Sequence, residues 1–353
     1  MASSTLTFPN QQELTQSAIH LASPNELQAG ESIAAKINSD PVSLYTRGTE
    51  LYNQKNYEEA ITTFNKVLKL SPNFVEAHLN RGASFLRLGD YSNALEDFES
   101  ALKLKPDYVD AWFNKGAVFE QQGQYEKALL AIDEAIKYQP TDPECWYSKG
   151  YSLLNLERFT DSITATERSI QLQDHNYDAW LNLGTAKVCL TQYSEAIDAF
   201  DKAIAIESNR PDAWSAKGLP LLYLKRYNEA ISAYSQAIEL KPELSKAWYN
   251  RACAYGLQGD AEKAIQDLGK ALDLYPDWRE DAKTEPDFDL VRNNHQFQKL
   301  LNGSTVSTLK QSSNTDNELT DVDDELNFER DAWRAYLDSE KEREEVYRHL
   351  ANS

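Results

Sequence analysis

The sequence predicts an all-α array of seven helix–turn–helix units, because two residue types recur with a period of 34 residues. A ladder of tryptophans follows this spacing, and a ladder of glycines shares it with an offset of four residues. A proline also recurs near the end of most periods, where it cannot continue a helix. The tryptophans are Trp112, Trp146, Trp180, Trp214 and Trp248, and the glycines are Gly48, Gly82, Gly116, Gly150, Gly184 and Gly218. Ladders in register indicate one repeated supersecondary unit.

The period at residues 109–142 shows how one unit is expected to fold. Apolar residues from Trp112 to Phe119 have helical spacing, and a polar break follows at 122–124. A second helical run continues until Pro140 ends the unit. The period therefore predicts a helix, a tight turn and a second helix.

Small residues are expected to let the two helices of a unit approach closely. Gly116 lies in the first helix and Ala128 in the second, and a larger side chain at either place would push the helices apart. A glycine inside a helix costs about 1 kcal/mol relative to alanine, so the packing must offset that amount.

This pattern resembles the tetratricopeptide repeat, the TPR, and seven repeats fit residues 41–278. The resemblance implies a right-handed superhelical solenoid whose first helices line a concave groove, and a protein partner that binds there. In the repeat that starts at Val109, the matching residues are Trp112, Gly116, Phe119, Ala128, Ala135 and Pro140.

Two repeats depart from the pattern in ways that predict local effects. In the fourth, Ser162, Thr166 and Ser169 replace small or aromatic packing residues, which predicts a less stable unit. In the sixth, Pro220 lies inside the first helix and predicts a kink.

The resemblance also implies which side chains face a ligand, from the second, fifth, ninth, twelfth and thirteenth positions of the first helices. These positions are aromatic and polar with little charge, which suits an extended peptide or a helix with apolar anchors. Packing between neighbouring repeats is the alternative role for each side chain. The candidate partner-binding residues are Tyr45, Tyr52, Phe113, Glu120, Tyr147, Tyr151, Asn155, Tyr223 and Tyr249.

The seventh position of the repeat is often basic, and two interpretations of this row are open. The cations form a line for an acidic partner, or their aliphatic stems pack while the charged groups reach water. The fifth position is never Lys and the ninth never Asn, which argues against the family's recognition of a C-terminal carboxylate. The basic residues are Arg47, Arg81, Lys115, Lys149, Lys217 and Arg251.

Four segments flank the array. Residues 1–40 carry no recognisable chemistry, and 279–303 are expected to cap the last repeat, which would otherwise expose its stacking face. Residues 304–324 are expected to form an acidic disordered linker, and 325–351 an amphipathic helix that docks on the array, binds a partner or dimerises. The contact residues expected on this helix are Trp333, Tyr336, Leu337 and Tyr347.

Composition disfavours several classes of partner and location. The net charge of −20 repels phosphate backbones and anionic lipid, so neither nucleic acid nor a membrane is an expected partner. Three cysteines without a close pair indicate a reducing compartment rather than a disulfide framework. The N-terminal residues are unlike a secretory signal, and a cytoplasmic location is expected.

Catalytic motifs are missing from the sequence. It has no glycine-rich phosphate loop, no HExxH and no nucleophile elbow, and no two histidines have metal-ligand spacing. We therefore expect no enzyme, no cofactor and no metal site. The predicted function is a protein–protein interaction scaffold or adaptor. The alternative is an assembly factor or chaperone that holds one client subunit during complex assembly.

Overall fold

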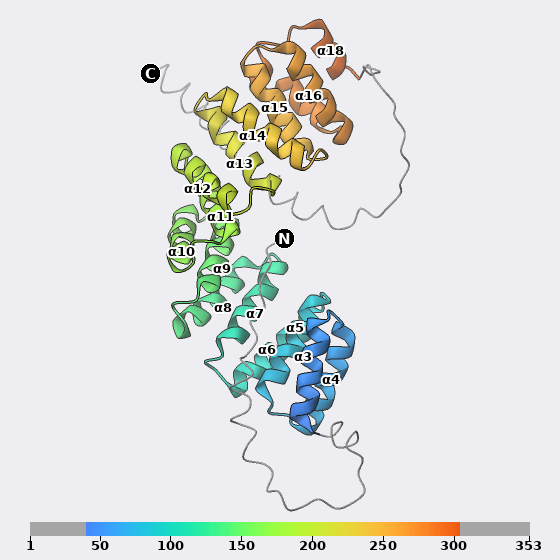
Figure 1. Ribbon diagram of the computed structural model, residues 1–353, viewed down its shortest axis with the longest axis vertical. Helices are drawn as coiled ribbons and strands as arrows, with labels where there is room; N and C mark the ends of the chain where they lie inside the picture. Colours follow the sequence, from blue (N-terminus) through green and yellow to red (C-terminus); the bar gives the residue numbers. More distant parts are fainter. Residues whose placement is uncertain (1–39, 304–353) are drawn as a thin grey trace, which may run out of the picture. The chain divides into compact units, whose positions relative to one another are not determined.

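The computed structural model describes residues 40–303, where α-helices are joined by short turns and one 3-10 helix lies near the end (Figure 1). No strand occurs within 40–303. The chain divides into two compact units at the junction of Gln173 and Asp174, and each unit is described by itself. Consecutive helices pair within each unit, which confirms the predicted all-α class of helix–turn–helix repeats.

The first unit contains four helix pairs, in each of which the first helix has 13 residues and the second has 14. The pairs are α3 (Pro41–Asn53) with α4 (Tyr57–Leu70), α5 (Val75–Arg87) with α6 (Tyr91–Leu104), α7 (Val109–Gln121) with α8 (Tyr125–Tyr138), and α9 (Pro143–Asn155) with α10 (Phe159–Leu172).

The second unit contains three more pairs of the same lengths, followed by a short C-terminal segment. The pairs are α11 (Tyr177–Cys189) with α12 (Tyr193–Ile206), α13 (Pro211–Tyr223) with α14 (Tyr227–Leu240), and α15 (Ser245–Leu257) with α16 (Ala261–Leu274). The segment contains α17 (Trp278–Thr284), η1 (Pro286–Phe288) and α18 (His295–Leu301).

The ladder glycines set the distance between the two helices of a pair. Each lies opposite a side chain of the second helix, sixteen residues later in the sequence. A Cβ atom on Gly184 would lie 2.7 Å from Cδ1 of Phe200, well inside van der Waals contact. The seventh repeat has Ala252 at this position, and there the opposing residue is Leu268 rather than an aromatic ring. Close approach of the helices therefore explains the glycine ladder.

The tryptophan ladder fixes the connection between successive repeats. Each ladder indole donates a hydrogen bond from Nε1 to the backbone carbonyl six residues earlier, at 2.8–3.0 Å. Trp180 makes this bond to Asp174 and Trp214 makes it to Ser208, although both partners replace the usual proline. The tryptophans are therefore structural, and the bond depends on the backbone rather than on proline.

The turn inside every pair requires one residue in the left-handed region of backbone conformation. Three repeats use glycine at this point, and the other four use Lys55 (φ 61°), Glu157 (φ 57°), Thr191 (φ 59°) and Lys225 (φ 57°). Such a conformation is unfavourable for a residue with a Cβ atom, above all for β-branched threonine. The packing of the helix pairs therefore imposes the turn on these four residues.

The fourth repeat has a polar interior between α9 and α10. Ser162 and Ser169 are buried and donate hydrogen bonds to backbone carbonyls of α9, at 2.8 and 2.9 Å. Thr166 lies opposite Gly150, and its hydroxyl is buried with no hydrogen-bond partner within 40–303. The lower stability of this repeat stays a prediction. In the sixth repeat, α13 continues unbroken through Pro220, and a kink there also stays a prediction.

The segment after α16 packs against the last helix pair. Phe288, Val291, Phe297 and Leu301 are buried in one hydrophobic cluster with residues of α15 and α16. Arg279 donates a hydrogen bond to the backbone carbonyl of Leu300, which ties the two ends of the segment together. We propose that 279–303 caps the array, because it covers apolar side chains that would otherwise face water.

Candidate functional site

The nine predicted partner-binding residues separate into two groups by burial. Tyr45, Tyr52, Phe113 and Tyr249 are buried. The other five keep partial exposure and remain candidates for contact with a partner. They are Glu120, Tyr147, Tyr151, Asn155 and Tyr223.

The buried group packs between helices. The hydroxyl of Tyr45 accepts a hydrogen bond from Nδ2 of Asn80 at 2.8 Å, and its ring stacks on that of Phe74 at 5.0 Å. Tyr249 packs edge-on against Trp278 and Phe288 of the C-terminal segment. For these side chains the structure shows the packing role that the sequence left open.

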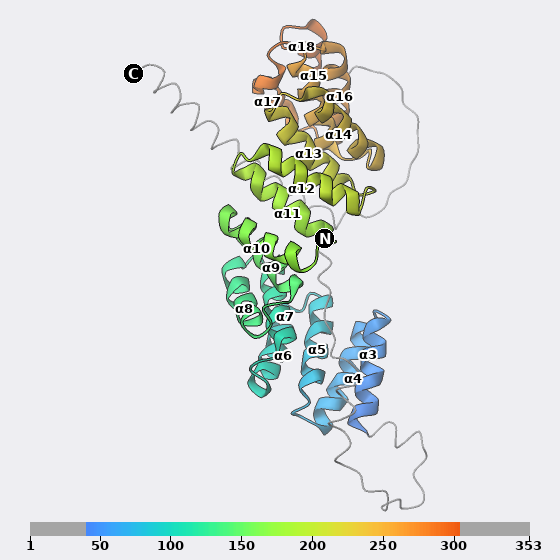
Figure 2. The ribbon, with the colours of Figure 1, turned by 60° about the vertical axis from the view of Figure 1, so that its left-hand side comes forward.

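Most of the exposed group gathers in the first unit around one carboxylate, that of Glu120. This residue lies in the last turn of α7, next to α9, and α5, α7 and α9 are neighbouring first helices (Figure 2). Ser152 donates a hydrogen bond to Oε1 of Glu120 at 2.7 Å, and Ser148 donates a longer one to Oε2 at 3.3 Å. No cation pairs with Glu120 within the described part of the chain.

Tyrosines from two helices lie next to this carboxylate. The ring of Tyr151 on α9 meets the ring of Tyr125 on α8 edge-on at 6.2 Å, and it stacks with Tyr147 at 6.5 Å. Asn155 donates a hydrogen bond from Nδ2 to the backbone carbonyl of Tyr151 at 2.8 Å. We call the set around the carboxylate the Glu120 cluster, which comprises Glu120, Tyr125, Tyr147, Ser148, Tyr151 and Ser152.

Burial dominates the electrostatics of the Glu120 cluster. It raises the pKa of Glu120 to about 7, although the hydrogen bonds from Ser152 and Ser148 oppose this shift. The pKa values of Tyr125 and Tyr151 are also raised, mainly by burial. The cluster therefore holds a carboxyl group whose negative charge is poorly compensated.

Sequence reasoning found three members of the Glu120 cluster, namely Glu120, Tyr147 and Tyr151, and missed the other three. Ser148 and Ser152 hold the carboxylate from the sixth and tenth positions of the next repeat, and Tyr125 starts a second helix. A usable signal was present, because hydroxyl residues occupy both positions of α9 immediately after a repeat with Glu at its twelfth position.

The last exposed candidate, Tyr223, belongs to the second unit. Its ring stacks almost parallel on that of Tyr193, with centroids 4.8 Å apart and an interplanar angle of 7°. Tyr193 begins α12 and Tyr223 ends α13, so this pair resembles the Tyr125–Tyr151 contact in joining a second helix to the next first helix.

The basic row at the seventh position is neutralised in the structure. Five of the six cations pair with an acidic residue of a second helix, and Arg47 pairs with Glu50 on its own helix. The interpretation of the row as an open cationic line is therefore wrong. The alternative, in which the charged groups only reach water, did not predict these ion pairs. The five pairs are Arg81–Asp97, Lys115–Glu99, Lys149–Asp133, Lys217–Asp201 and Arg251–Asp267.

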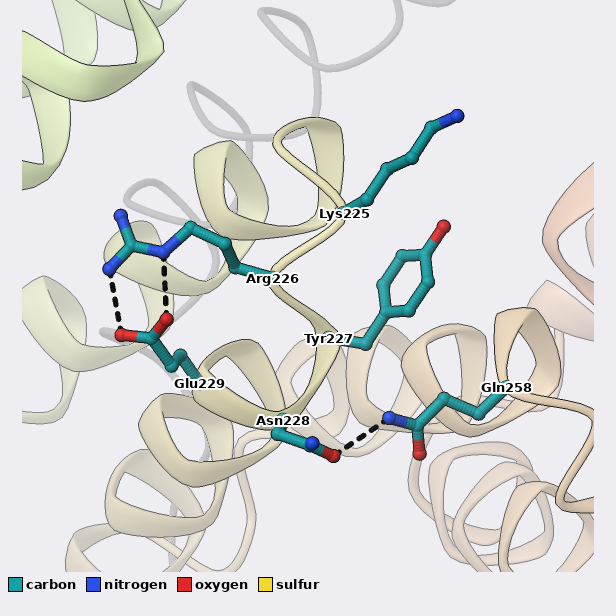
Figure 3. A pocket seen from close by; sticks show the side chains of 6 residues that line it. All are labelled: Lys225, Arg226, Tyr227, Asn228, Glu229 and Gln258. Atoms are coloured by element: carbon teal, nitrogen blue, oxygen red, sulfur yellow. Dashed lines mark hydrogen bonds and ion pairs between the residues drawn. The ribbon is translucent and has the colours of Figure 1, made fainter.

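A small polar pocket of about 200 Å³ opens at the turn between α13 and α14 (Figure 3). Arg226 and Glu229 face each other in a two-bond ion pair on one side, and Asn228 accepts a hydrogen bond from Gln258 on the other. These four residues satisfy one another, and Lys225 and Tyr227 complete the lining of the pocket.

Other kinds of site find no support in the described residues. No group of His, Cys, Asp and Glu side chains within 40–303 has the geometry to hold a metal ion. No helix in that range combines the length and apolar character needed to span a bilayer. The expected tail contacts Trp333, Tyr336, Leu337 and Tyr347 lie outside the described residues, as do 1–39 and the rest of 304–353.

The helix pairs and the two ladders define a helical-repeat protein. We call the surface formed by the first helices of the pairs, α3, α5, α7, α9, α11, α13 and α15, the first-helix face. A Tetratricopeptide repeat family model matches residues 82–143 and 147–213, a TPR repeat model matches 48–89 and 218–259, and another Tetratricopeptide repeat model matches 245–277. The chain belongs to the tetratricopeptide repeat family, whose members mediate interactions between proteins. A comparison with curated proteins gives no match.

Solved structures show the same fold. The C-terminal part of a TPR repeat-containing protein from Cytophaga hutchinsonii is 21% identical with a TM-score of 0.54, covering 66% of this chain and 95% of that one. PilF of Pseudomonas aeruginosa is 18% identical with a TM-score of 0.53, covering 59% and 94%. A tetratricopeptide repeat protein from Parabacteroides merdae is 15% identical with a TM-score of 0.52, covering 74% and 97%. At these identities the likeness concerns the fold alone.

Proposed function

We propose that this chain is a non-enzymatic, cytoplasmic scaffold or adaptor that binds a peptide or helix of a partner protein on its first-helix face. The observation that carries the proposal is the Glu120 cluster. It combines partly exposed tyrosines with a carboxylate that no cation of the described chain neutralises. The two serine bonds join α7 to α9 but leave the negative charge without a cation.

The chemistry of this surface suits a polypeptide. Tyrosine offers a large, rigid contact area with a polar end, and tyrosines are enriched among the residues that dominate binding energy. Tyr147 and Tyr151 lie one turn apart on α9 and present both features. Asn155 continues the same helix face with an amide that can exchange its local hydrogen bond for one to a peptide backbone.

Site-specific photo-crosslinking in the native host tests this proposal. A photoreactive amino acid would replace Tyr147 or Asn155 on α9. In a matched control it would replace Leu130, which is 71% exposed on the second helix α8. We expect crosslinks to partner proteins from the α9 positions and not from the control. Crosslinking that is equal from all three positions, or that occurs only from the control, would refute the proposal.

The number of crosslinked proteins separates the adaptor from the alternative. Several stable partners support the adaptor, whereas one unassembled subunit captured only during assembly supports an assembly factor or chaperone. The same experiment on a chain that ends at residue 303 shows whether the remaining residues compete for this face. Increased crosslinking without 304–353 would support docking of the tail in cis.

A further inference from the structure

Glu120 differs from Asp97 and Asp267, two buried acids of the array, in what compensates its charge. Asp97 pairs with Arg81 in the first unit, and Asp267 pairs with Arg251 in the second. Among the described residues, Glu120 accepts hydrogen bonds only from two neutral hydroxyl groups, those of Ser148 and Ser152. A carboxylate removed from water is strongly favoured by a nearby cation, and hydroxyl donors replace only part of that stabilisation.

The carboxylate also has unused capacity to accept hydrogen bonds. Two carboxylate oxygens provide about four acceptor positions, of which the serines occupy two. The bond to Oε2 is 3.3 Å long, against 2.7 Å for Oε1, so Oε2 is the less satisfied atom. An ammonium or guanidinium group has the donors that this atom lacks.

The tyrosines supply the second element of a cation site. Aromatic faces attract cations through the ring quadrupole, and the effect grows when the cation is desolvated. Tyr147 and Tyr151 stack on one side of the cluster, and Tyr125 meets Tyr151 edge-on. The groups that face the carboxylate are thus tyrosines and serines from α8 and α9.

We infer that the Glu120 cluster receives a lysine or arginine side chain of the bound partner, with the carboxylate as its counter-ion and Tyr147 and Tyr151 as its aromatic wall. The inference rests on the proposed function, because it names the chemistry that the first-helix face recognises. The net charge of −20 favours the same partner, since it attracts basic polypeptides over long range.

The electrostatics of the free protein support the assignment. Burial raises the pKa of Glu120 to about 7, so a cation that seats beside it stabilises the ionised form and lowers that pKa. Binding near neutral pH then releases a proton from Glu120. Titration calorimetry in buffers of different ionisation enthalpy measures this release directly.

Selection from a random peptide library displayed on phage tests the inference with the full chain. The wild type is compared with Glu120→Gln and with Glu126→Gln, which removes the same charge from an exposed position of α8 outside the cluster. We expect the wild type and Glu126→Gln to enrich peptides that share a basic residue at a fixed place. Glu120→Gln should lose that residue, and should bind the selected peptides about tenfold more weakly or worse.

The outcomes separate the inference from the function on which it rests. Peptides enriched without a shared basic residue, or with the same basic residue for Glu120→Gln, would overturn the inference and leave the proposed function standing. A wild-type chain that enriches no peptide would overturn both. We expect Glu120→Gln to fold, because removal of an uncompensated buried charge should stabilise the chain rather than disrupt it. Circular dichroism checks this expectation.

Discussion

The glycine ladder makes a quantitative prediction in the fifth repeat, where Gly184 on α11 faces Phe200 on α12. We consider the variant Gly184→Ala alone and together with Phe200→Leu. A Cβ atom on residue 184 would lie 2.7 Å from Cδ1 of Phe200, whose side chain is 1% exposed and cannot move aside freely. The single variant therefore tests how rigid the contact between the two helices is.

Two opposing terms set the size of the effect. Alanine stabilises a helix interior by about 1 kcal/mol relative to glycine. Overpacking in a close-packed core costs roughly 1–3 kcal/mol, and this contact is at the severe end. We expect Gly184→Ala to lower the free energy of unfolding by about 1–2 kcal/mol. Phe200→Leu should relieve the clash, because the seventh repeat combines Ala252 with Leu268 at the same two positions, both buried.

Hydrogen exchange measured by mass spectrometry is the appropriate assay, because an array of repeats need not unfold in one step. Amides of α11 and α12 should lose protection in Gly184→Ala and regain it in the double variant. Gly116→Ala is the matched comparison, since it faces the more adaptable Ile132 and should lose less. If the effects of Gly184→Ala and Phe200→Leu simply add, the steric account of the ladder is wrong.

Three further perturbations have defined outcomes. Glu120→Gln should be more stable than the wild type by roughly 1–2 kcal/mol above pH 7, after allowance for partial exposure, and equally stable near pH 4.5. Because the pKa of Glu120 is raised in the folded wild type, the wild type loses stability as the pH rises from about 4.5 through about 7. Thermal melts of the wild type and the variant across this range measure the loss. Trp180→Phe removes the bond to the carbonyl of Asp174 and should destabilise the start of α11 by about 1 kcal/mol, seen as faster local exchange; unchanged exchange would count against the role of the indole. Thr166→Val removes an unpartnered buried hydroxyl and should raise the melting temperature, whereas Thr63→Val, which loses a bond to Glu59, should not.

The fold was predictable because its determinants are periodic. A glycine in six of the seven repeats and a tryptophan in five mark the period. The structure explains the glycine by the close approach of two paired helices, and the tryptophan by its bond to the connection from the preceding repeat. The turn residue was not predictable in the same way. Lys55 and Thr191 adopt the left-handed conformation that sequence assigns to glycine, because the helix pairs on either side impose it.

The sequence predicted which helix face carries the candidate site, but it did not predict how deeply each side chain is buried. Tyr45 and Tyr147 both occupy the fifth position of a first helix, yet Tyr45 is buried and Tyr147 remains partly exposed. Tyr45 packs against Phe74 at the end of its own repeat and is hydrogen-bonded by Asn80 of the next repeat, so its burial depends on residues outside its own helix. The prediction for the basic row failed because five of its six cations pair with acids on second helices, which the pattern of the first helices alone does not show.

A double-mutant cycle between Glu120 and a bound peptide tests the central claim most directly. The peptide is one selected by the wild-type chain, with its shared basic residue kept or replaced by glutamine, and titration calorimetry gives all four affinities. We predict that Glu120→Gln and the peptide change each weaken binding, and that their coupling energy exceeds about 1 kcal/mol. Effects that add to within about 0.5 kcal/mol would show that the first-helix face does not recognise its partner through Glu120.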